Sequence, residues 1–315
     1  MSLHVIILAA GKGSRMKSDT PKVLHPVAGT PMLHRVMSTA KRLAPEQLHL
    51  VLGHGIEAIQ DTLADQWSAT NIVQQAEQLG TGHAVNIALD HLPNDGISLV
   101  LYGDVPLITV DTLEHCVAIA DAGELGIVTA NMSDPAQLGR ILRNDTDAIE
   151  AIVEYKDATQ QQRAIHEINS GILAAPTHLL RHWLSQVQPN NQQGEYYLTD
   201  VVALAVNDGV GVQGIVVDDE NEVMGVNDRV QLSQVERILQ RRQADELMRH
   251  GVTFADPDRV DIRGTLSCET DCFIDVNTVF IGDVRLASGV VIGPNVVIES
   301  SQLGAGVQVK ANTVI

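Results

Sequence analysis

A loop near the start of the chain concentrates groups that bind anions. It follows an aliphatic run at residues 5–10 and carries four basic side chains, Lys12, Arg15, Lys17 and Lys22. Glycines at positions 11 and 13 allow backbone amides to approach phosphate oxygens closely. Arg15 can hold two phosphate oxygens with its forked N–H groups, whereas Lys22 acts as a point charge. The loop is therefore a candidate phosphate-binding site, with a solvated surface loop as the alternative.

Two familiar phosphate-binding motifs do not account for this loop. A dinucleotide-binding G-x-G-x-x-G motif requires a third glycine at position 16, where this sequence has Met16. The G-x4-G-K-S/T pattern of a P-loop is also absent. What remains is a flexible glycine loop in which Arg15 and Lys22 are separated by a turn that contains Pro21.

Length and composition restrict the class of protein. The chain has 315 residues, which is natural for two domains, and 44% of them are hydrophobic. Only 3% are aromatic, so the core must be aliphatic, which suits a parallel sheet buried on both faces. The net charge of −18 disfavours nucleic-acid binding. Because neither a secretory signal nor an apolar run of membrane-spanning length is present, we expect a cytoplasmic protein without membrane insertion.

The three cysteines suggest no covalent framework. They are Cys116, Cys268 and Cys272. An odd number of cysteines is typical of a reducing compartment. The last two form a C-x3-C pair, but no nearby histidine or cysteine completes a zinc site, so we expect packing residues.

Strand-like and helix-like segments alternate up to about residue 120. Expected strands cover residues 3–10, 48–53, 70–75 and 97–104, and expected helices cover 31–43, 56–65, 80–92 and 111–122. Four such units predict a parallel, doubly wound sheet that binds ligands at the carboxyl ends of its strands. The loops after Ala10, Gln75 and Gly103 are the first candidates. Residues 125–175 add four further strands as a mixed or antiparallel part, before a helix at 195–206 and a strand at 211–217.

The last third of the chain has a different period. We expect a first domain at 1–227, a linker helix at 228–250 and a final domain at 251–315. In the final domain, apolar residues recur every six positions from Ile274 to Ile298 and continue to Ile315 after one five-residue step. This spacing predicts a β-helix of hexapeptides, whereas ordinary antiparallel strands would alternate with a period of two. The pattern stops without a polar capping repeat, so we expect a truncated form of a longer protein.

Several motifs together resemble one enzyme family. L-x2-G-x-G-x-R-M followed by PK is similar to the signature of sugar-1-phosphate nucleotidyltransferases. The segments QQAEQLGTGHA, LYGDVPLI, GRI, IVEYKDAT, EINSGI, GEYYLTD and VMGVNDRVQLSQVER resemble the bacterial bifunctional N-acetylglucosamine-1-phosphate uridylyltransferase/glucosamine-1-phosphate N-acetyltransferase. The resemblance covers essentially the whole chain in the right order. It implies an α/β fold with a Rossmann-like doubly wound mixed sheet of the nucleotide-diphospho-sugar transferase type, followed by the start of a left-handed parallel β-helix.

The resemblance also implies an activity. Members of this family make UDP-N-acetylglucosamine and pyrophosphate from UTP and N-acetylglucosamine-1-phosphate with Mg²⁺, which feeds peptidoglycan and lipopolysaccharide synthesis. The parent protein is expected to acetylate glucosamine-1-phosphate with acetyl-CoA as well, and to form a homotrimer. In the family a β-helix histidine serves as the base for acetyl transfer. Residues 251–315 contain no histidine, so we expect that second site to be absent from this chain.

Site residues follow from the same resemblance. The uridine side is matched by Leu8, Ala9, Ala10, Gly11, Gln75, Gly80 and Thr81. The nucleotide and metal segment is matched by Tyr102, Gly103 and Asp104, with Asn227 as the second metal ligand. The sugar side is matched by Gly139, Glu154 and Asn169, with Tyr197 and Thr199 as further candidates. Leu138 departs from the family, which often has an aromatic residue at that position.

Each of these assignments competes with a structural interpretation. Thr81 and Asn227 are plausible helix N-caps, because short polar side chains satisfy the first backbone N–H groups of a helix. Asp104 and Asn169 could equally belong to turns, and Glu154 could be a solvated strand residue. The individual motifs therefore carry less weight than their combination.

The expected reaction requires cationic groups that stabilise negative charge, and it requires no general base. A sugar-1-phosphate carries close to two negative charges at neutral pH, so it needs no general base. Arg15 and Lys22 are the expected catalytic residues, because they can hold the departing pyrophosphate. One alternative is a nucleotidyltransferase of the glucose-1-phosphate type. Another is a non-catalytic subunit that binds a nucleotide sugar, but such a subunit would be expected to lack the charged residues that this chain retains.

Overall fold

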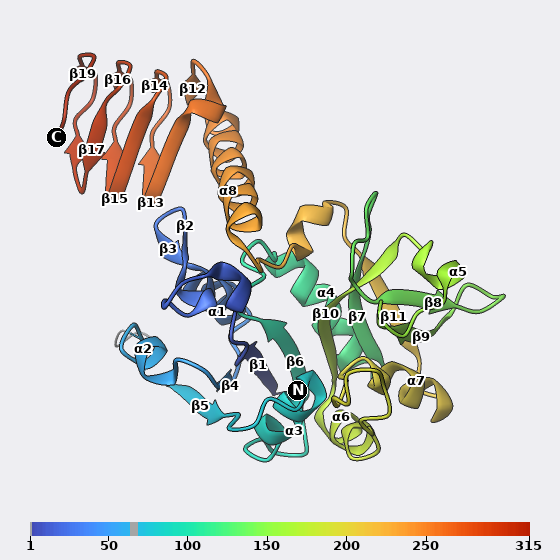
Figure 1. Ribbon diagram of the computed structural model, residues 1–315. Helices are drawn as coiled ribbons and strands as arrows, with labels where there is room; N and C mark the ends of the chain where they lie inside the picture. Colours follow the sequence, from blue (N-terminus) through green and yellow to red (C-terminus); the bar gives the residue numbers. More distant parts are fainter. Residues whose placement is uncertain (1, 64–68) are drawn as a thin grey trace. The chain divides into compact units, whose positions relative to one another are not determined.

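The computed structural model describes residues 2–63 and 69–315. They divide into two compact units (Figure 1). Unit 1 comprises Met1–Leu24 and Leu33–Asn227, and unit 2 comprises His25–Met32 and Asp228–Ile315. The short segment 25–32, which the sequence analysis placed in the first domain, is grouped with the second unit.

Unit 1 is built on a mixed sheet. Its strand order is β11-β7-β10-β6-β1-β4-β5, and β8 and β9 extend it beside β10. The strands β1, β4, β5 and β6 run parallel, whereas β10 is antiparallel to both β6 and β7. The bounds are β1 Leu3–Ala9, β4 Gln47–Leu52, β5 Thr70–Gln74, β6 Ile97–Tyr102, β7 Leu125–Asn131, β8 Arg140–Arg143, β9 Ile149–Val153, β10 Glu167–Pro176 and β11 Val212–Val216. The predicted mixed, doubly wound sheet is confirmed.

Helices cover both faces of this sheet. Along β1, Val5 and Ile7 join one apolar cluster, while Ile6 and Leu8 join the other. The first cluster includes side chains of α1 and α4, and the second includes side chains of α3, α6 and α7. The helix bounds are α1 Met32–Arg42, α2 Ile56–Gln60, α3 Thr81–Leu89, α4 Val110–Asp121, α5 Gln160–Arg163, α6 Thr177–Leu184 and α7 Asp200–Asn207. An aliphatic sheet enclosed in this way explains the low aromatic content.

The strand order creates a crevice beside β1. From β1 the chain proceeds to β4 and β5 on one side, then returns to β6 on the other side. Because the loops that leave β1 and β6 turn in opposite directions, a gap opens at the carboxyl ends of these two strands. Two of the predicted ligand loops, those after Ala10 and Gly103, leave from these strand ends.

Several element boundaries differ from the predictions. Pro31 does not lie in the first turn of α1 but pairs with Pro26 in the hairpin of β2 (Pro26–Val27) and β3 (Thr30–Pro31). Helix α2 ends at Gln60, and residues 64–65 of the predicted helix lie outside the described residues. Helix α7 begins only at Asp200 because the preceding residues are hydrogen-bonded elsewhere, as described below.

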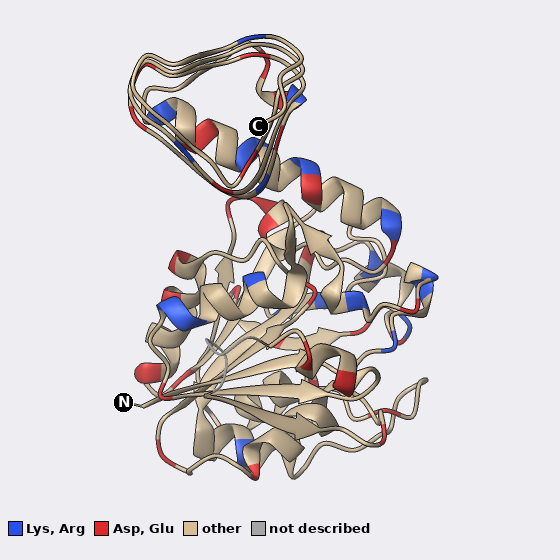
Figure 2. Cartoon of the chain, turned by 90° about the vertical axis from the view of Figure 1, so that its left-hand side faces the viewer, with Lys and Arg blue, Asp and Glu red and all other residues tan. Residues whose placement is uncertain are grey.

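Unit 2 contains a long helix and stacked parallel coils. Helix α8 spans Arg229–Arg249. The coils carry β12 Thr253–Phe254, β13 Val260–Cys268, β14 Phe273–Ile274, β15 Thr278–Leu286, β16 Val291–Ile292, β17 Val297–Glu299, β18 Gln302–Leu303 and β19 Gln308–Val309. Paired strands are parallel, and most are 18 residues apart, as in Val260 with Thr278. The first pair, Thr253 with Phe273, is 20 apart, and the last pairs, Arg285 with Gln302 and Val291 with Gln308, are 17 apart. Three hexapeptides per turn explain the 18-residue offset, and Figure 2 shows the three-sided outline of the coils.

Most residues predicted to point into the coils form their core, but the prediction fails at the end of the series, where Ile315 is 43% exposed and Leu303 is only partly buried. Ile274, Phe280, Leu286, Ile292 and Ile298 are all buried in one apolar cluster. The arrangement is that of a parallel β-helix, and its left-handed sense stays a prediction. None of the helices within residues 2–63 and 69–315 combines the length and apolar composition that crossing a membrane requires.

Candidate active site

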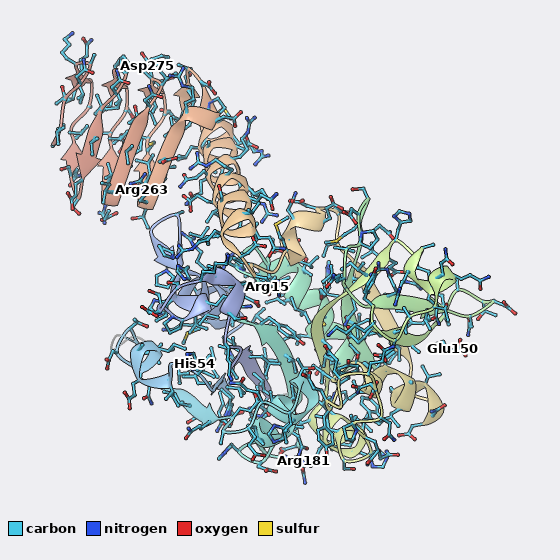
Figure 3. All side chains as sticks on the ribbon, in the orientation of Figure 1. Arg15, His54, Glu150, Arg181, Arg263 and Asp275 are labelled. Carbon is cyan, nitrogen blue, oxygen red and sulfur yellow. The ribbon has the colours of Figure 1, made fainter. Side chains whose placement is uncertain are left out.

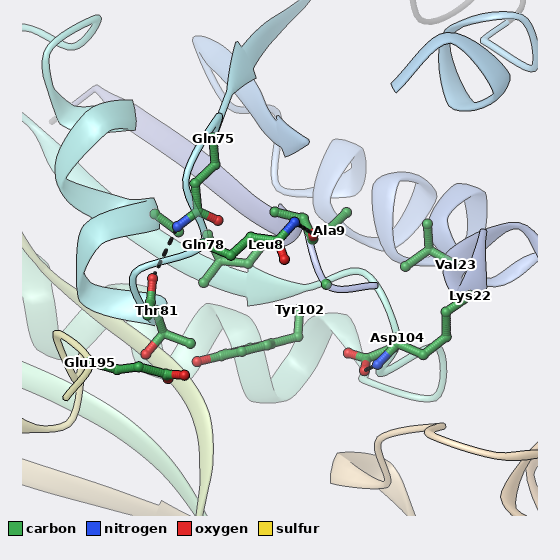
Figure 4. Close-up of a pocket in the computed structure, with 14 residues that line it drawn as sticks. Leu8, Ala9, Lys22, Val23, Gln75, Gln78, Thr81, Tyr102, Asp104 and Glu195 are labelled. Carbon is green, nitrogen blue, oxygen red and sulfur yellow. Dashed lines mark hydrogen bonds and ion pairs between the residues drawn. The ribbon is translucent and has the colours of Figure 1, made fainter. Parts of the chain in front are cut away.

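A pocket of about 320 Å³ opens at the carboxyl ends of β1 and β6 (Figure 4). Its lining contains ten predicted site residues, namely Leu8, Ala9, Ala10, Gly11, Lys22, Gln75, Gly80, Thr81, Tyr102 and Asp104. Four more lining residues, Val23, Gln78, Ala84 and Glu195, were not predicted. The predicted uridine side and the predicted phosphate side therefore share one cavity.

The turn between β5 and α3 forms one end of the pocket. Gln75 is only 4% exposed, and its amide Nε2 donates to the carbonyl of Gly80 at 3.2 Å and lies 3.1 Å from Nδ1 of His83. Gly80 has φ of 115°, and a Cβ there would lie 2.5 Å from the carbonyl oxygen of Tyr196. Only glycine fits both requirements. The helix is capped at Gly80 without a side-chain bond, so the N-cap alternative for Thr81 is wrong.

The opposite end of the pocket carries a cation between two oxygen groups. Lys22 Nζ forms an ion pair with Asp104 Oδ2 and donates to Asn227 Oδ1 at 3.3 Å. The side chains of Lys22 and Asp104 are 13% and 16% exposed. The backbone N–H of Val226 donates to the carbonyl of Asp104 at 2.9 Å and fixes the two segments together.

Asn227 is available for this contact because it does not cap α8. The cap is Asp228, whose carboxylate accepts from the N–H groups of Val230 and Gln231. The N-cap interpretation of Asn227 is therefore wrong. Residues 104 and 227 lie far apart in the sequence, yet their side-chain oxygens converge on one ammonium group.

This oxygen pair fits a divalent cation. A carboxylate and an amide oxygen are suitable ligands for Mg²⁺, which usually takes its remaining ligands from water and substrate phosphates. The ammonium of Lys22 shows that both oxygens can face a single positive charge. Within residues 2–63 and 69–315, no cluster of three His, Cys, Asp or Glu side chains offers a complete metal cage. Asp104 and Asn227 would thus hold an ion that is shared with a phosphorylated ligand.

The glycine loop packs directly against Lys22. Gly13 has φ of 59°, and a Cβ at this position would lie 2.5 Å from Cβ of Lys22. The short helical turn Ser14–Met16 follows, in which Met16 is buried and Arg15 is exposed. Arg15 is labelled in Figure 3. Among the described residues, Arg15 has no hydrogen bond or ion pair. Its guanidinium is therefore unpaired, although Arg15 is not among the residues that line the pocket.

The predicted sugar-side residues lie together outside this pocket lining. Asn169 donates its backbone N–H to the carbonyl of Gly139 at 2.9 Å, and the Thr199 hydroxyl donates to Glu154 Oε1 at 3.3 Å. A Cβ at Gly139 would lie 3.4 Å from Glu154 Oε1. Burial raises the pKa of the Glu154 carboxyl, and the hydrogen bond from Thr199 partly offsets this increase. Glu154 and Tyr197 instead line a smaller pocket of about 140 Å³.

Tyr102 lies near both the residues that line the main pocket and the predicted sugar-side residues. Burial raises the pKa of its hydroxyl, and the nearby carboxylates of Glu154 and Asp104 raise it further. A Cβ at Gly171, where φ is 86°, would lie 2.6 Å from the Tyr102 ring. The glycine in the predicted EINSGI motif therefore makes room for this ring.

Sequence reasoning missed residues that shape the site through long-range contacts. Gln78 Nε2 donates to the carbonyl of Ala10 at 3.0 Å and joins the β5–α3 turn to the end of β1. Arg140 is 2% exposed and donates to the carbonyls of Pro135, Ala136 and Leu138, so it shapes the loop beside Gly139. Leu138 itself is 40% exposed. The signal available in the sequence was an arginine, Arg140, directly after Gly139, a candidate sugar-binding residue.

The segment before α7 joins both sides of the site. The N–H of Tyr196 donates to the carbonyl of Leu79, its carbonyl accepts from Gly82, and the N–H of Leu198 donates to Thr81 Oγ1. These bonds hold residues 195–197 out of the helix, while residues 198–199 form the turn that leads into it. They also explain why α7 starts later than predicted.

Comparisons with known proteins identify the fold and the family of the chain. Residues 5–189 match the family model of the MobA-like NTP transferase domain. A UDP-glucose pyrophosphorylase complexed with UDP-glucose has a TM-score of 0.61 over 77% of this chain and 100% of its own, at 15% identity. A putative glucose-1-phosphate thymidylyltransferase from Bacillus anthracis has a TM-score of 0.59 over 75% of this chain and 95% of its own, at 18% identity. These structures share the fold, and the family match makes the chain a nucleotidyltransferase.

Its relatives define the family more narrowly. The bifunctional protein GlmU of Marinobacter nauticus is 52% identical over 99% of this chain and 68% of its own length. GlmU of Alkalilimnicola ehrlichii is 51% identical over 100% of this chain and 67% of its own length. GlmU of Acinetobacter baumannii is 49% identical over 100% of this chain and 68% of its own length. The chain belongs to the GlmU family. It spans about two thirds of the length of these relatives.

Proposed function

We propose that the chain transfers UMP from UTP to N-acetylglucosamine-1-phosphate, releasing pyrophosphate and forming UDP-N-acetylglucosamine. The observation that carries this proposal is one pocket with a glutamine-lined turn at one end and Lys22, Asp104 and Asn227 near the other. The turn that carries Gln75 suits the nucleotide base of UTP, and the end with Lys22, Asp104 and Asn227 suits its phosphates. The product would supply peptidoglycan and lipopolysaccharide synthesis.

The reaction is a substitution at the α-phosphorus of UTP. A phosphate oxygen of the sugar phosphate forms the new bond, and the bond between the α-phosphorus and the bridging oxygen breaks as pyrophosphate leaves. The nucleophile is already anionic at neutral pH, so no side chain has to remove a proton. The protein instead has to orient two anions and stabilise the charge that builds on the leaving group.

The basic residues supply this stabilisation. Lys22 is held at the cationic end of the pocket by Asp104 and Asn227. Arg15 lies on the exposed loop after Gly13 and can bind two oxygens of the departing pyrophosphate. Because the chain carries a net charge of −18, attraction for the substrates has to come from such local cations.

Asp104 and Asn227 would hold Mg²⁺ in this reaction. The ion, when bound, would neutralise charge on the phosphates of both substrates. The sugar would lie toward Gly139, Glu154 and Asn169, where the half-buried carboxylate and backbone groups can accept or donate hydrogen bonds. Gly139 would leave room for the acetamido group.

A substrate panel tests the proposal. The chain is incubated with Mg²⁺ and each pairing of UTP or dTTP with N-acetylglucosamine-1-phosphate or glucose-1-phosphate, and the nucleotide sugars are identified by mass spectrometry. We expect the fastest turnover for UTP with N-acetylglucosamine-1-phosphate. Preferential use of glucose-1-phosphate would instead establish the alternative glucose-1-phosphate type of nucleotidyltransferase.

A further inference from the structure

The orientation of the Gln75 amide is determined by its surroundings. The carbonyl oxygen of Gly80 can only accept a hydrogen bond, and it lies 3.2 Å from the terminal group of Gln75. That group must therefore be the NH₂ of the amide, since an oxygen in its place would face another acceptor. Gln75 is 4% exposed, so an unfavourable contact of this kind would not be relieved by water.

His83 takes part in the same arrangement. Its Nδ1 lies 3.1 Å from Nε2 of Gln75. Because an amide NH₂ only donates, Nδ1 has to accept, which requires a neutral ring protonated on its other nitrogen. His83 lies in the first turn of α3, two residues after Thr81, so the helix fixes its position beside the turn.

Both amide protons of Gln75 are thus directed to protein acceptors. Within the described part of the chain, Gln75 Oε1 receives no hydrogen bond, and Gln75 lines the 320 Å³ pocket. Figure 4 shows the amide nitrogen turned to Gly80 and the oxygen turned away from it. For a ligand in the pocket, the Gln75 amide can therefore act as an acceptor alone.

We propose that His83 is a positioning residue that holds Gln75 in this orientation and thereby selects uracil over cytosine. The N3 atom of uracil carries a proton and can donate to Oε1, whereas N3 of cytosine is an acceptor and would oppose it. Without an acceptor at position 83, only the bond to the Gly80 carbonyl opposes a flip of the amide, so offering the NH₂ group to cytosine costs less free energy than with His83 in place. This inference rests on the proposed function in placing the nucleotide base at Gln75.

The test compares UTP with CTP. The value of kcat/KM is measured for both nucleotides with the unmodified chain, His83→Leu, His83→Asn and the control Asn86→Ala, which changes an exposed residue of the same helix. His83→Leu should lower the UTP/CTP ratio about tenfold, the effect of losing one buried hydrogen bond. His83→Asn should largely restore the ratio, because its amide oxygen can occupy the position of Nδ1.

Binding of UDP and CDP, measured by calorimetry, separates this inference from the proposed function. If the chain forms no UDP-sugar, the proposed function fails, but the UDP/CDP affinity ratio still reports on His83. An unchanged ratio in folded His83→Leu would overturn the inference, as would an equal loss in Asn86→Ala. If His83→Leu does not fold, His83→Ala is used as a second variant without an acceptor. An unchanged UDP/CDP affinity ratio in His83→Ala would likewise overturn the inference.

Discussion

At the scale of single residues, the cation of Lys22 is held where phosphates would need it. Its ammonium contacts Asp104 and Asn227, and its stem packs against Gly13. A long flexible side chain normally loses conformational freedom when it binds. Because Asp104 and Asn227 are proposed to hold Mg²⁺ during the reaction, the packing of Lys22 against Gly13 is what would restrict this side chain beforehand, which is a form of preorganisation for anion binding.

Asp104→Ala should lower kcat by about a hundredfold or more while the chain stays folded. The carboxylate lies at the end of a strand and is not part of the apolar core, but it orients Lys22 and offers a metal ligand. Steady-state pyrophosphate release and circular dichroism measure the two effects. Asp111→Ala, at an exposed position on α4, is the matched control. Normal magnesium-dependent turnover in Asp104→Ala would refute the role given to this carboxylate.

At the scale of elements, one buried carboxylate connects the Asn227 segment to α4. Glu222 is 7% exposed, and its Oε1 accepts from the backbone N–H of Thr109 at 3.0 Å and from its hydroxyl at 2.7 Å. Thr109 is the N-cap of α4. Together with the bond from Val226 to the Asp104 carbonyl, this contact fixes Asn227 opposite Asp104.

Glu222→Ala should therefore raise the Mg²⁺ concentration needed for half-maximal rate several-fold. It should also lower the free energy of unfolding by about 1–3 kcal/mol, because two donors of Thr109 lose a buried partner. Glu222→Gln keeps an acceptor oxygen and should behave more like the unmodified chain. The control is Glu220→Ala, at an exposed position in the same turn. Unchanged magnesium dependence in Glu222→Ala would show that the segment is positioned by other contacts.

The framework of the site could be predicted because its determinants are local. Aliphatic runs ending in glycine or aspartate indicated β1 and β6, and their carboxyl ends do form the pocket. The six-residue spacing indicated the coils, since each inward position is occupied by an apolar side chain. Asn227 was identified by resemblance to a family, because its local sequence also fits a helix cap.

The remaining site residues depend on contacts that no local pattern encodes. Gln78 and His83 acquire their roles only when the β5–α3 turn folds against β1 and Gln75. The irregular segment before α7 was predicted to be helical, but the backbone of Tyr196 pairs with Leu79 and Gly82. Tertiary hydrogen bonds in this way override the local preference.

At the scale of the whole molecule, the two units have separate apolar cores. The clusters around the sheet contain residues of unit 1, whereas the cluster of α8 and the coils contains residues of unit 2. Every residue assigned here to substrate or metal binding belongs to unit 1. The chemistry should therefore be insensitive to moderate changes inside the coils.

Phe280→Ala tests this separation. Phe280 is 1% exposed and is stacked between Ile262 and Ile298 of the adjacent coils, so its truncation should cost about 3–5 kcal/mol of folding free energy. Chemical denaturation should reveal the loss, while kcat and the KM for UTP at 25 °C stay within about twofold. Val291→Ala, at a partly exposed position of β16, is the control. A loss of turnover in a still-folded Phe280→Ala chain would contradict the separation.

The most direct test of the central claim is a crystal structure of this chain with UDP-N-acetylglucosamine and Mg²⁺. We predict that the uracil contacts Gln75 and the turn at Gly80, and that the diphosphate lies at Lys22, Asp104 and Asn227. The sugar should lie beside Gly139, Glu154 and Asn169. Well-defined density for the nucleotide sugar elsewhere, with the pocket at the ends of β1 and β6 empty, would contradict the account.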